Sequence, residues 1–188
     1  VGFDFDEIVG KKNMPLPWSE ELTEELRARL GEDWGIYMAA LWADMEDRAL
    51  TAKVRYAYMD IVTRLVARCF SRKLGDWCQE RGVEYIGHIV EDKNQHARLG
   101  SSQGHFFRAM EGQHMSGIDD IGGQVMPEGE HVTRRGFTGA PGASGEFYHF
   151  ELGKLGTSYA HIDPRKQGRT MCEIFGAYGW SEGVHLEK

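Results

Sequence analysis

Side chains with acid–base chemistry crowd into residues 85–124, between two short apolar runs. The first run, residues 83–90, has the composition of a buried strand and ends on Glu91 and Asp92;. The second run contains Asp119. Polar groups at the ends of buried strands line ligand sites in α/β barrels and open α/β sheets. The segment therefore predicts the rim of a substrate site.

Glu91 and Glu173 are the predicted catalytic carboxylates. Glu91 closes the first apolar run, and Glu173 lies within the apolar run 170–175. Burying a charged carboxylate in an apolar strand costs free energy, so such a group usually has an ion-pair partner or a functional role. Glycoside hydrolysis uses two carboxylates, one to protonate the leaving oxygen and one as base or nucleophile. A structural alternative stays open, in which Glu91 is a solvated strand end and Glu173 pairs with Arg165 or Arg169.

Histidine, arginine, amide and aromatic side chains near these carboxylates form the predicted sugar-binding set. Imidazole and carboxylate groups also bind zinc and similar ions, but the sequence has no HxH or HExxH pair, so no metal or cofactor is assigned;. A metal-dependent hydrolase using His88, His114 and Asp119 stays open as an alternative. The predicted substrate-binding residues are His88, Asp92, His96, Arg98, His105, Arg108, Gln113, His114, Asp119, Tyr178 and Trp180.

Two helix–strand units are expected to position these groups. Residues 50–81 carry a wide apolar stripe at helical spacing, and a glycine turn leads from them into the strand 83–90;. A second helix within residues 146–163 precedes a strand at 170–175;. Helices that alternate with apolar strands favour a parallel sheet.

The N-terminal part predicts one further helix. Ser19 has the type of an N-cap, and Leu22 and Leu26 recur at helical spacing until Gly31 ends the run;. Residues 34–42 fit a helix or a strand equally well.

Composition narrows the class of protein. With 188 residues and 41% hydrophobic residues, the chain suits one globular domain, and its net charge of -7 argues against nucleic-acid binding;. No apolar run is long enough to span a membrane;. Cys69, Cys78 and Cys172 form no CxxC pair, so we expect Cys69 and Cys78 to be buried, and a reducing, cytoplasmic location is mildly favoured;.

Two motifs carry a resemblance to a known group of enzymes: GHIVED at residues 87–92 and CEIFGAYGW at 172–180. From about residue 14 to residue 183 the chain resembles the TIM-barrel catalytic domains of large bacterial glycoside hydrolases, a group that includes β-galactosidase-like and α-L-rhamnosidase-like enzymes. The resemblance implies cleavage of a terminal sugar, with Glu91 as general acid and Glu173 as nucleophile or base. It also implies that Asp92, His88 and Asp119 support catalysis or bind sugar.

The length departs from that resemblance, because a complete barrel needs about 250 residues. We therefore expect residues 1–188 to form a single α/β domain, a partial (β/α)8 TIM barrel of parallel strands alternating with helices, about half of the whole. The start at Val1 rather than Met also suggests an excised piece. The expected partners are a carbohydrate, the remainder of the parent chain and a second copy, with little catalysis by the piece alone. A non-catalytic carbohydrate-binding domain is the remaining alternative.

Overall fold

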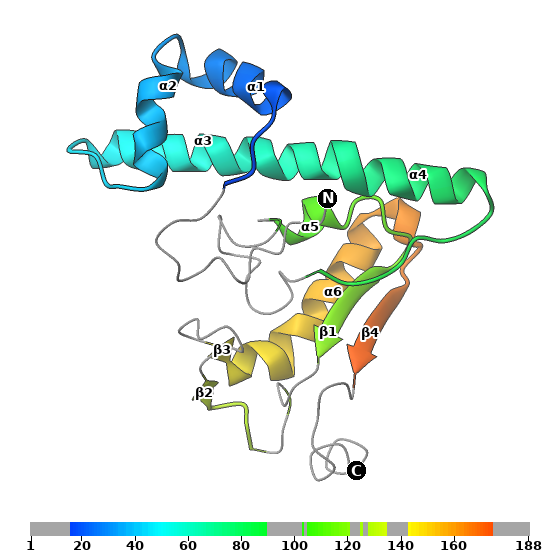
Figure 1. Cartoon of the computed structure of the whole chain (residues 1–188). Helices are drawn as coiled ribbons and strands as arrows, with labels where there is room; N and C mark the ends of the chain where they lie inside the picture. Colours follow the sequence, from blue (N-terminus) through cyan, green and yellow to red (C-terminus); the bar gives the residue numbers. More distant parts are fainter. Residues whose placement is uncertain are drawn as a thin grey trace.

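Helices dominate the structure, and one of them packs against a small parallel sheet (Figure 1). The computed structural model describes residues 16–89, 103, 105–120, 125, 128–134 and 143–174. In the described part of the chain, every helix is too short or too polar to cross a bilayer. In chain order the elements are α1 (Glu20–Leu30), α2 (Trp34–Tyr37), η1 (Met38–Leu41), α3 (Arg48–Val66), η2 (Ala67–Ser71), α4 (Arg72–Glu80), α5 (Phe106–Ala109), β1 (Ser116–Asp120), β2 (Thr133–Arg134), β3 (Ala143–Ser144), η4 (Phe147–Glu151), α6 (Leu152–Ile162), η5 (Pro164–Lys166) and β4 (Thr170–Ile174).

The predicted N-terminal helix is confirmed as α1. The Ser19 hydroxyl accepts a hydrogen bond from the Leu22 amide at 3.1 Å, which satisfies one of the free N–H groups of the first turn;. Gly31 ends the helix with φ 85, a left-handed conformation that glycine adopts without strain;. Residues 34–41, which the sequence left open, are helical.

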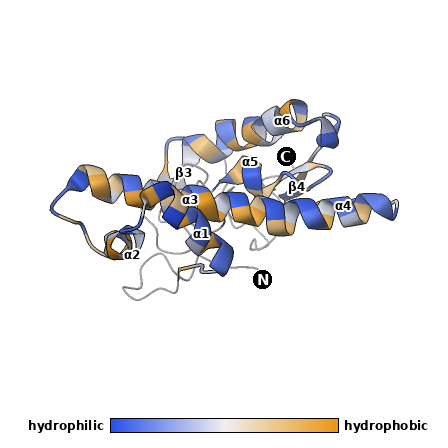
Figure 2. Cartoon of the chain, turned by 90° about the horizontal axis from the view of Figure 1, so that it is seen from above, coloured by the Kyte–Doolittle hydropathy of each residue, from blue (hydrophilic) through white to orange (hydrophobic). Residues whose placement is uncertain are grey.

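The helix predicted over residues 50–81 is confirmed as one continuous rod, α3–η2–α4, in which η2 is a turn of π-helix (Figure 1). Asp47 caps its start by accepting from two amides, and Gly82, at φ 67, follows its end;. Apolar and polar residues recur along α3, as an amphipathic helix requires (Figure 2);. The prediction for Cys69 was wrong, because that side chain is exposed, whereas Cys78 is buried.

Two separate hydrophobic cores stabilise the fold. The first core lies between α1 and α3, and we call the elements around it the helical unit. The second core lies between α5, β1 and α6, and we call the elements around it the sheet unit. The buried members of the first are Leu22, Leu26, Met38, Ala40, Val54, Tyr58, Met59, Ile61 and Val62. Those of the second are Ile89, Phe106, Ala109, Met110, Ile118, Phe147, Tyr148, Leu152 and Tyr159.

A parallel pair, β1 and β4, forms the sheet of the second unit, with α6 between them in sequence. The helix predicted within residues 146–163 and the strand predicted at residues 170–175 are confirmed as α6 and β4. Helix α6 covers one face of β1, because a Cβ built on Gly156 would stand 3.1 Å from Ile118 Cγ2. The arrangement is mixed α/β, and the described residues contain two parallel strands rather than the four of a half-barrel. The short antiparallel pair β2–β3 was not predicted.

The prediction of a strand at residues 83–90 was wrong for the residues that the structure describes. Residues 83–89 belong to no helix or strand. They follow β1 instead through isolated contacts, such as the hydrogen bond from the His114 amide to the Tyr85 carbonyl at 2.8 Å. The strand-like composition of this apolar run therefore did not make it a strand of the sheet.

Candidate functional site

Asp119 and Glu173 lie side by side near the carboxyl ends of the two parallel strands. The register of β1 and β4 pairs Asp119 with Glu173 and Ile118 with Cys172. Successive side chains of a strand alternate between its faces, so the two carboxylates share the face opposite the one that α6 covers through Ile118;. The carboxyl end of parallel strands is where α/β proteins place ligand sites.

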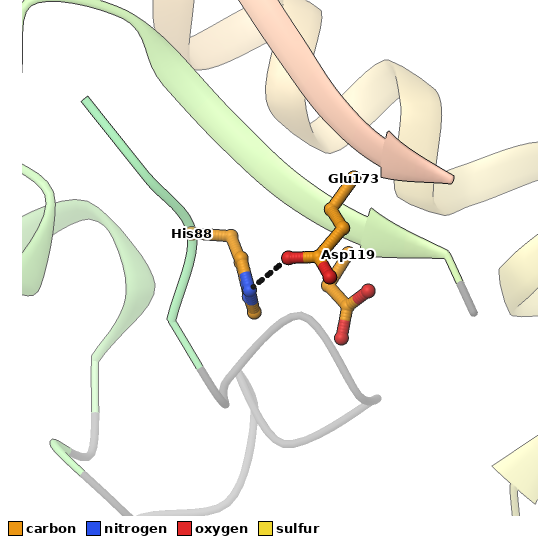
Figure 3. Close-up of side chains that lie close together, drawn as sticks. All are labelled: His88, Asp119 and Glu173. Atoms are coloured by element: carbon orange, nitrogen blue, oxygen red, sulfur yellow. Dashed lines mark ion pairs between the residues drawn. The ribbon is translucent and has the colours of Figure 1, made fainter. Parts of the chain in front are cut away.

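His88 reaches this carboxylate pair from residues 83–89. Its Nε2 lies 3.1 Å from Glu173 Oε2, and the close-up shows the imidazole facing the Glu173 carboxylate beside Asp119 (Figure 3). One ligand atom from each of the three residues lies within 4.8 Å of the other two. The three groups come from three separate segments of the chain, so their convergence is a product of the fold.

The three side chains differ in their access to solvent. Asp119 is 1% exposed, whereas 30% of the His88 side chain and 51% of the Glu173 side chain are exposed. A ligand arriving from solvent therefore meets Glu173 first, with His88 at its side and Asp119 beneath. Such a group can transfer protons, attack an electrophilic carbon or bind a cation.

Several further contacts hold residues 83–89 against the sheet. Arg169 donates two hydrogen bonds to Glu84, at 3.1 and 2.5 Å, and they lower the pKa of the Glu84 carboxyl;. The Tyr85 amide donates to His114 Nδ1 at 3.0 Å. Gly117 packs so closely on residue 87 that a Cβ there would stand 1.7 Å from the Gly87 oxygen.

No protein-family model, curated protein or solved structure matches this chain. Its function must therefore be inferred from the chemistry of its own residues.

Other predicted sugar-binding residues have structural contacts. Arg108 Nη1 donates to Asp60 Oδ1 at 2.6 Å and to Thr63 Oγ1 at 2.7 Å. His105 caps α5 by accepting from the Arg108 amide, and burial, with the Arg108 charge second, lowers the pKa of its imidazole. The hydrogen bonds of Arg108 place α5 at the junction with α3.

Gln113 and His114 are both buried. The Gln113 carbonyl accepts a 2.9 Å hydrogen bond from Lys166 Nζ, while His114 holds Tyr85 as described above. His114 does not belong to the three-residue group, so the metal alternative loses one of its expected ligands and gains Glu173. The remaining predicted site residues lie outside the described part of the chain, and they are Glu91, Asp92, His96, Arg98, Tyr178 and Trp180.

Arg165 and Arg169, which the structural alternative offered as partners of Glu173, bind Asp76 and Glu84 instead. Three residues that position the site escaped the sequence reasoning: Glu84, Gly87 and Gly117. A signal for two of them exists in the sequence. Gly87 directly precedes His88, and Gly117 lies two residues before a carboxylate in a buried strand. A glycine inside a strand pattern often marks a close approach by another backbone.

Proposed function

We propose that this chain is the part of a (β/α)8-barrel glycoside hydrolase that supplies Glu173 as the sugar-facing carboxylate. One observation carries the proposal: a half-exposed carboxylate stands at the carboxyl end of a parallel strand, between an imidazole and a buried second carboxylate. Barrel enzymes place catalytic residues at that end of their strands. The β1–α6–β4 order is also the repeating unit of such a barrel.

Glu173 acts here as nucleophile or base. As nucleophile, it attacks the anomeric carbon while the bond to the leaving oxygen breaks, and the bond's electron pair goes to that oxygen together with a proton from the general acid. Water then hydrolyses the glycosyl ester. The acid of the proposal is Glu91, which lies outside the described residues. Asp119 is too covered to touch a sugar, so it acts through its neighbours.

The test uses the full-length protein and a panel of 4-nitrophenyl glycosides. We expect hydrolysis of at least one glycoside, and a loss of about 10²–10⁴-fold in kcat for Glu173→Gln, because the amide can neither attack nor accept a proton. Glu151→Gln, an exposed glutamate of η4, is the matched control and keeps the wild-type rate. A Glu173→Gln variant with the wild-type kcat would refute the proposal.

A second candidate function is favoured by the closeness of His88, Asp119 and Glu173. One imidazole and two carboxylates within 4.8 Å of one another are ligands of the types that divalent metal ions bind;. In that case the protein is a metal-dependent hydrolase, and Glu173 is a ligand rather than a nucleophile. Dialysis against a chelator distinguishes the two. It abolishes hydrolysis by a metal-dependent enzyme and leaves a carboxylate-dependent glycosidase at full activity.

A further inference from the structure

Glu173 needs a partner that fixes its carboxylate. Half of its side chain is exposed, and it stands on β4, whose residues are largely exposed. An exposed glutamate side chain has several rotamers, and choosing one of them costs conformational entropy. A group that holds the carboxylate before the substrate arrives removes that cost from the reaction.

His88 is placed to do this. Its Nε2 lies 3.1 Å from Oε2, while the other oxygen of Glu173 points away from the imidazole (Figure 3). One oxygen is thereby held and the other is presented. Asp119 also faces the pair, as the neighbour of Glu173 in the strand register.

The backbone of His88 is itself held at a fixed distance from β4. Arg169 binds Glu84 and Glu173 binds His88, so the two side-chain contacts are four residues apart along both segments. Between them, residue 87 rests on Gly117, where no side chain fits. The segment therefore runs in the same direction as β4, with anchors before His88 and at His88 itself.

We infer that His88 is a positioning residue, whose imidazole holds Oε2 of Glu173 and so aims the other oxygen at the substrate. The inference rests on the proposed role of Glu173 in catalysis. His88 does not itself exchange a proton or a bond with the sugar. Its effect is on the fraction of molecules in which Glu173 is correctly placed.

The first experiment measures the contact without any substrate. In protein labelled with ¹⁵N at histidine, the Nε2 resonance of His88 is recorded in the wild type, in Glu173→Ala and in the control Glu151→Ala. We expect the resonance to move only in Glu173→Ala. An unmoved resonance overturns the inference, whether or not the protein hydrolyses glycosides.

The second experiment compares His88→Gln with His88→Leu in the glycoside assay. Glutamine keeps a side-chain N–H donor, whereas leucine fills similar space without one. We expect His88→Leu to lower kcat by up to about 10²-fold with little change in KM, and His88→Gln to recover most of the loss. His131→Leu, at an exposed histidine in a turn, is the control. Equal kcat values for wild type and His88→Leu overturn the inference.

The two experiments separate its failure from that of the proposed function. A resonance that depends on Glu173 in a protein that hydrolyses no glycoside supports the positioning contact and refutes the glycosidase. Glycoside hydrolysis by a protein whose His88 resonance is unchanged in Glu173→Ala supports the glycosidase and refutes the positioning contact.

Discussion

Arg108 donates a 2.6 Å hydrogen bond to Asp60 and thereby joins the sheet unit to the helical unit. Asp60 lies in α3, and its side chain is 5% exposed. Arg29 of α1 and Arg64 of α3 bind its other oxygen, at 2.6 and 3.2 Å. One carboxylate therefore ties three helices together, and the two hydrophobic cores meet at a polar contact.

Replacing Asp60 should destabilise the protein strongly. Asp60→Asn removes the charge that three guanidinium groups share, and breaking a buried ion pair from one side costs about 3–5 kcal/mol. Urea unfolding measures the loss. The control is Asp44→Asn, which removes an exposed carboxylate paired with Arg55 and should cost under about 1 kcal/mol;. Similar losses in both variants would show that the Asp60 contact does not stabilise the fold.

Asp60 should also make the stability depend on pH. Burial alone would raise the pKa of its carboxyl, but hydrogen bonds from Arg29 and Arg108 and the charge of Arg64 lower it below the ordinary value. A lowered folded-state pKa stabilises the fold above the unfolded-state pKa of about 3.9, and this stability is lost as pH falls through the folded-state value. Urea midpoints measured from pH 7 down to pH 3 should fall less steeply in Asp60→Asn than in the wild type.

Gly117→Ala should destabilise the fold, because the new methyl group collides with the Gly87 carbonyl. Backbone atoms must move to admit it, at a cost of about 1–3 kcal/mol. Gly153→Ala in α6 is the control, since open space surrounds that position and alanine is the better helix former by about 0.5–1 kcal/mol;. Thermal unfolding should therefore give opposite signs for the two changes. Unchanged stability in Gly117→Ala would contradict the close contact.

Lys166→Met should lower the melting temperature of the protein. Lys166 is fully buried, and its Nζ donates to the carbonyls of Met110 and Gln113 and to Asp163, at 2.8–2.9 Å. Methionine keeps the volume but removes all three hydrogen bonds. The Met110 carbonyl still accepts from the Gln113 amide at 3.0 Å, whereas the Gln113 carbonyl and Asp163 lose the donor that Lys166 supplies, at about 1–3 kcal/mol for each buried group;. Lys154→Met, at an exposed position of α6, is the control and should change the melting temperature little.

Self-association should occur through the outer edge of β4. In the described part of the chain β4 pairs with β1 alone, and Ile174 at its end is 45% exposed. Unpaired strand edges with exposed apolar residues promote association. Sedimentation velocity at micromolar concentrations should show species larger than a monomer, and Ile174→Lys should reduce them. A monomer at every concentration would contradict this expectation.

The helices were predictable because their signals are local. The cap at Ser19 and the apolar stripe of α3 lie within single segments, and each specifies its own element;. Cys69 was misassigned because it lies in the π-helical turn η2, which interrupts the regular helical spacing of the stripe;.

The site was only partly predictable because its geometry depends on contacts between distant segments. His88, Asp119 and Glu173 were all named from residue type, yet their convergence depends on the register of β1 and β4, which no local pattern encodes;. The same holds for Arg108, which was predicted to bind sugar and binds a carboxylate of α3. Residue type indicated polar chemistry correctly, and the partner depended on the fold.

The contact between Gly87 and Gly117 gives this site a recognisable sequence pattern. Wherever the same geometry occurs, a glycine must stand two residues before the aspartate, because a Cβ there would meet the backbone oxygen of the residue before the histidine. An arginine four residues before the glutamate completes the pattern, matched by an acid four residues before the histidine. Relatives too divergent to be found by overall similarity can therefore be sought by these few residues at their fixed spacing.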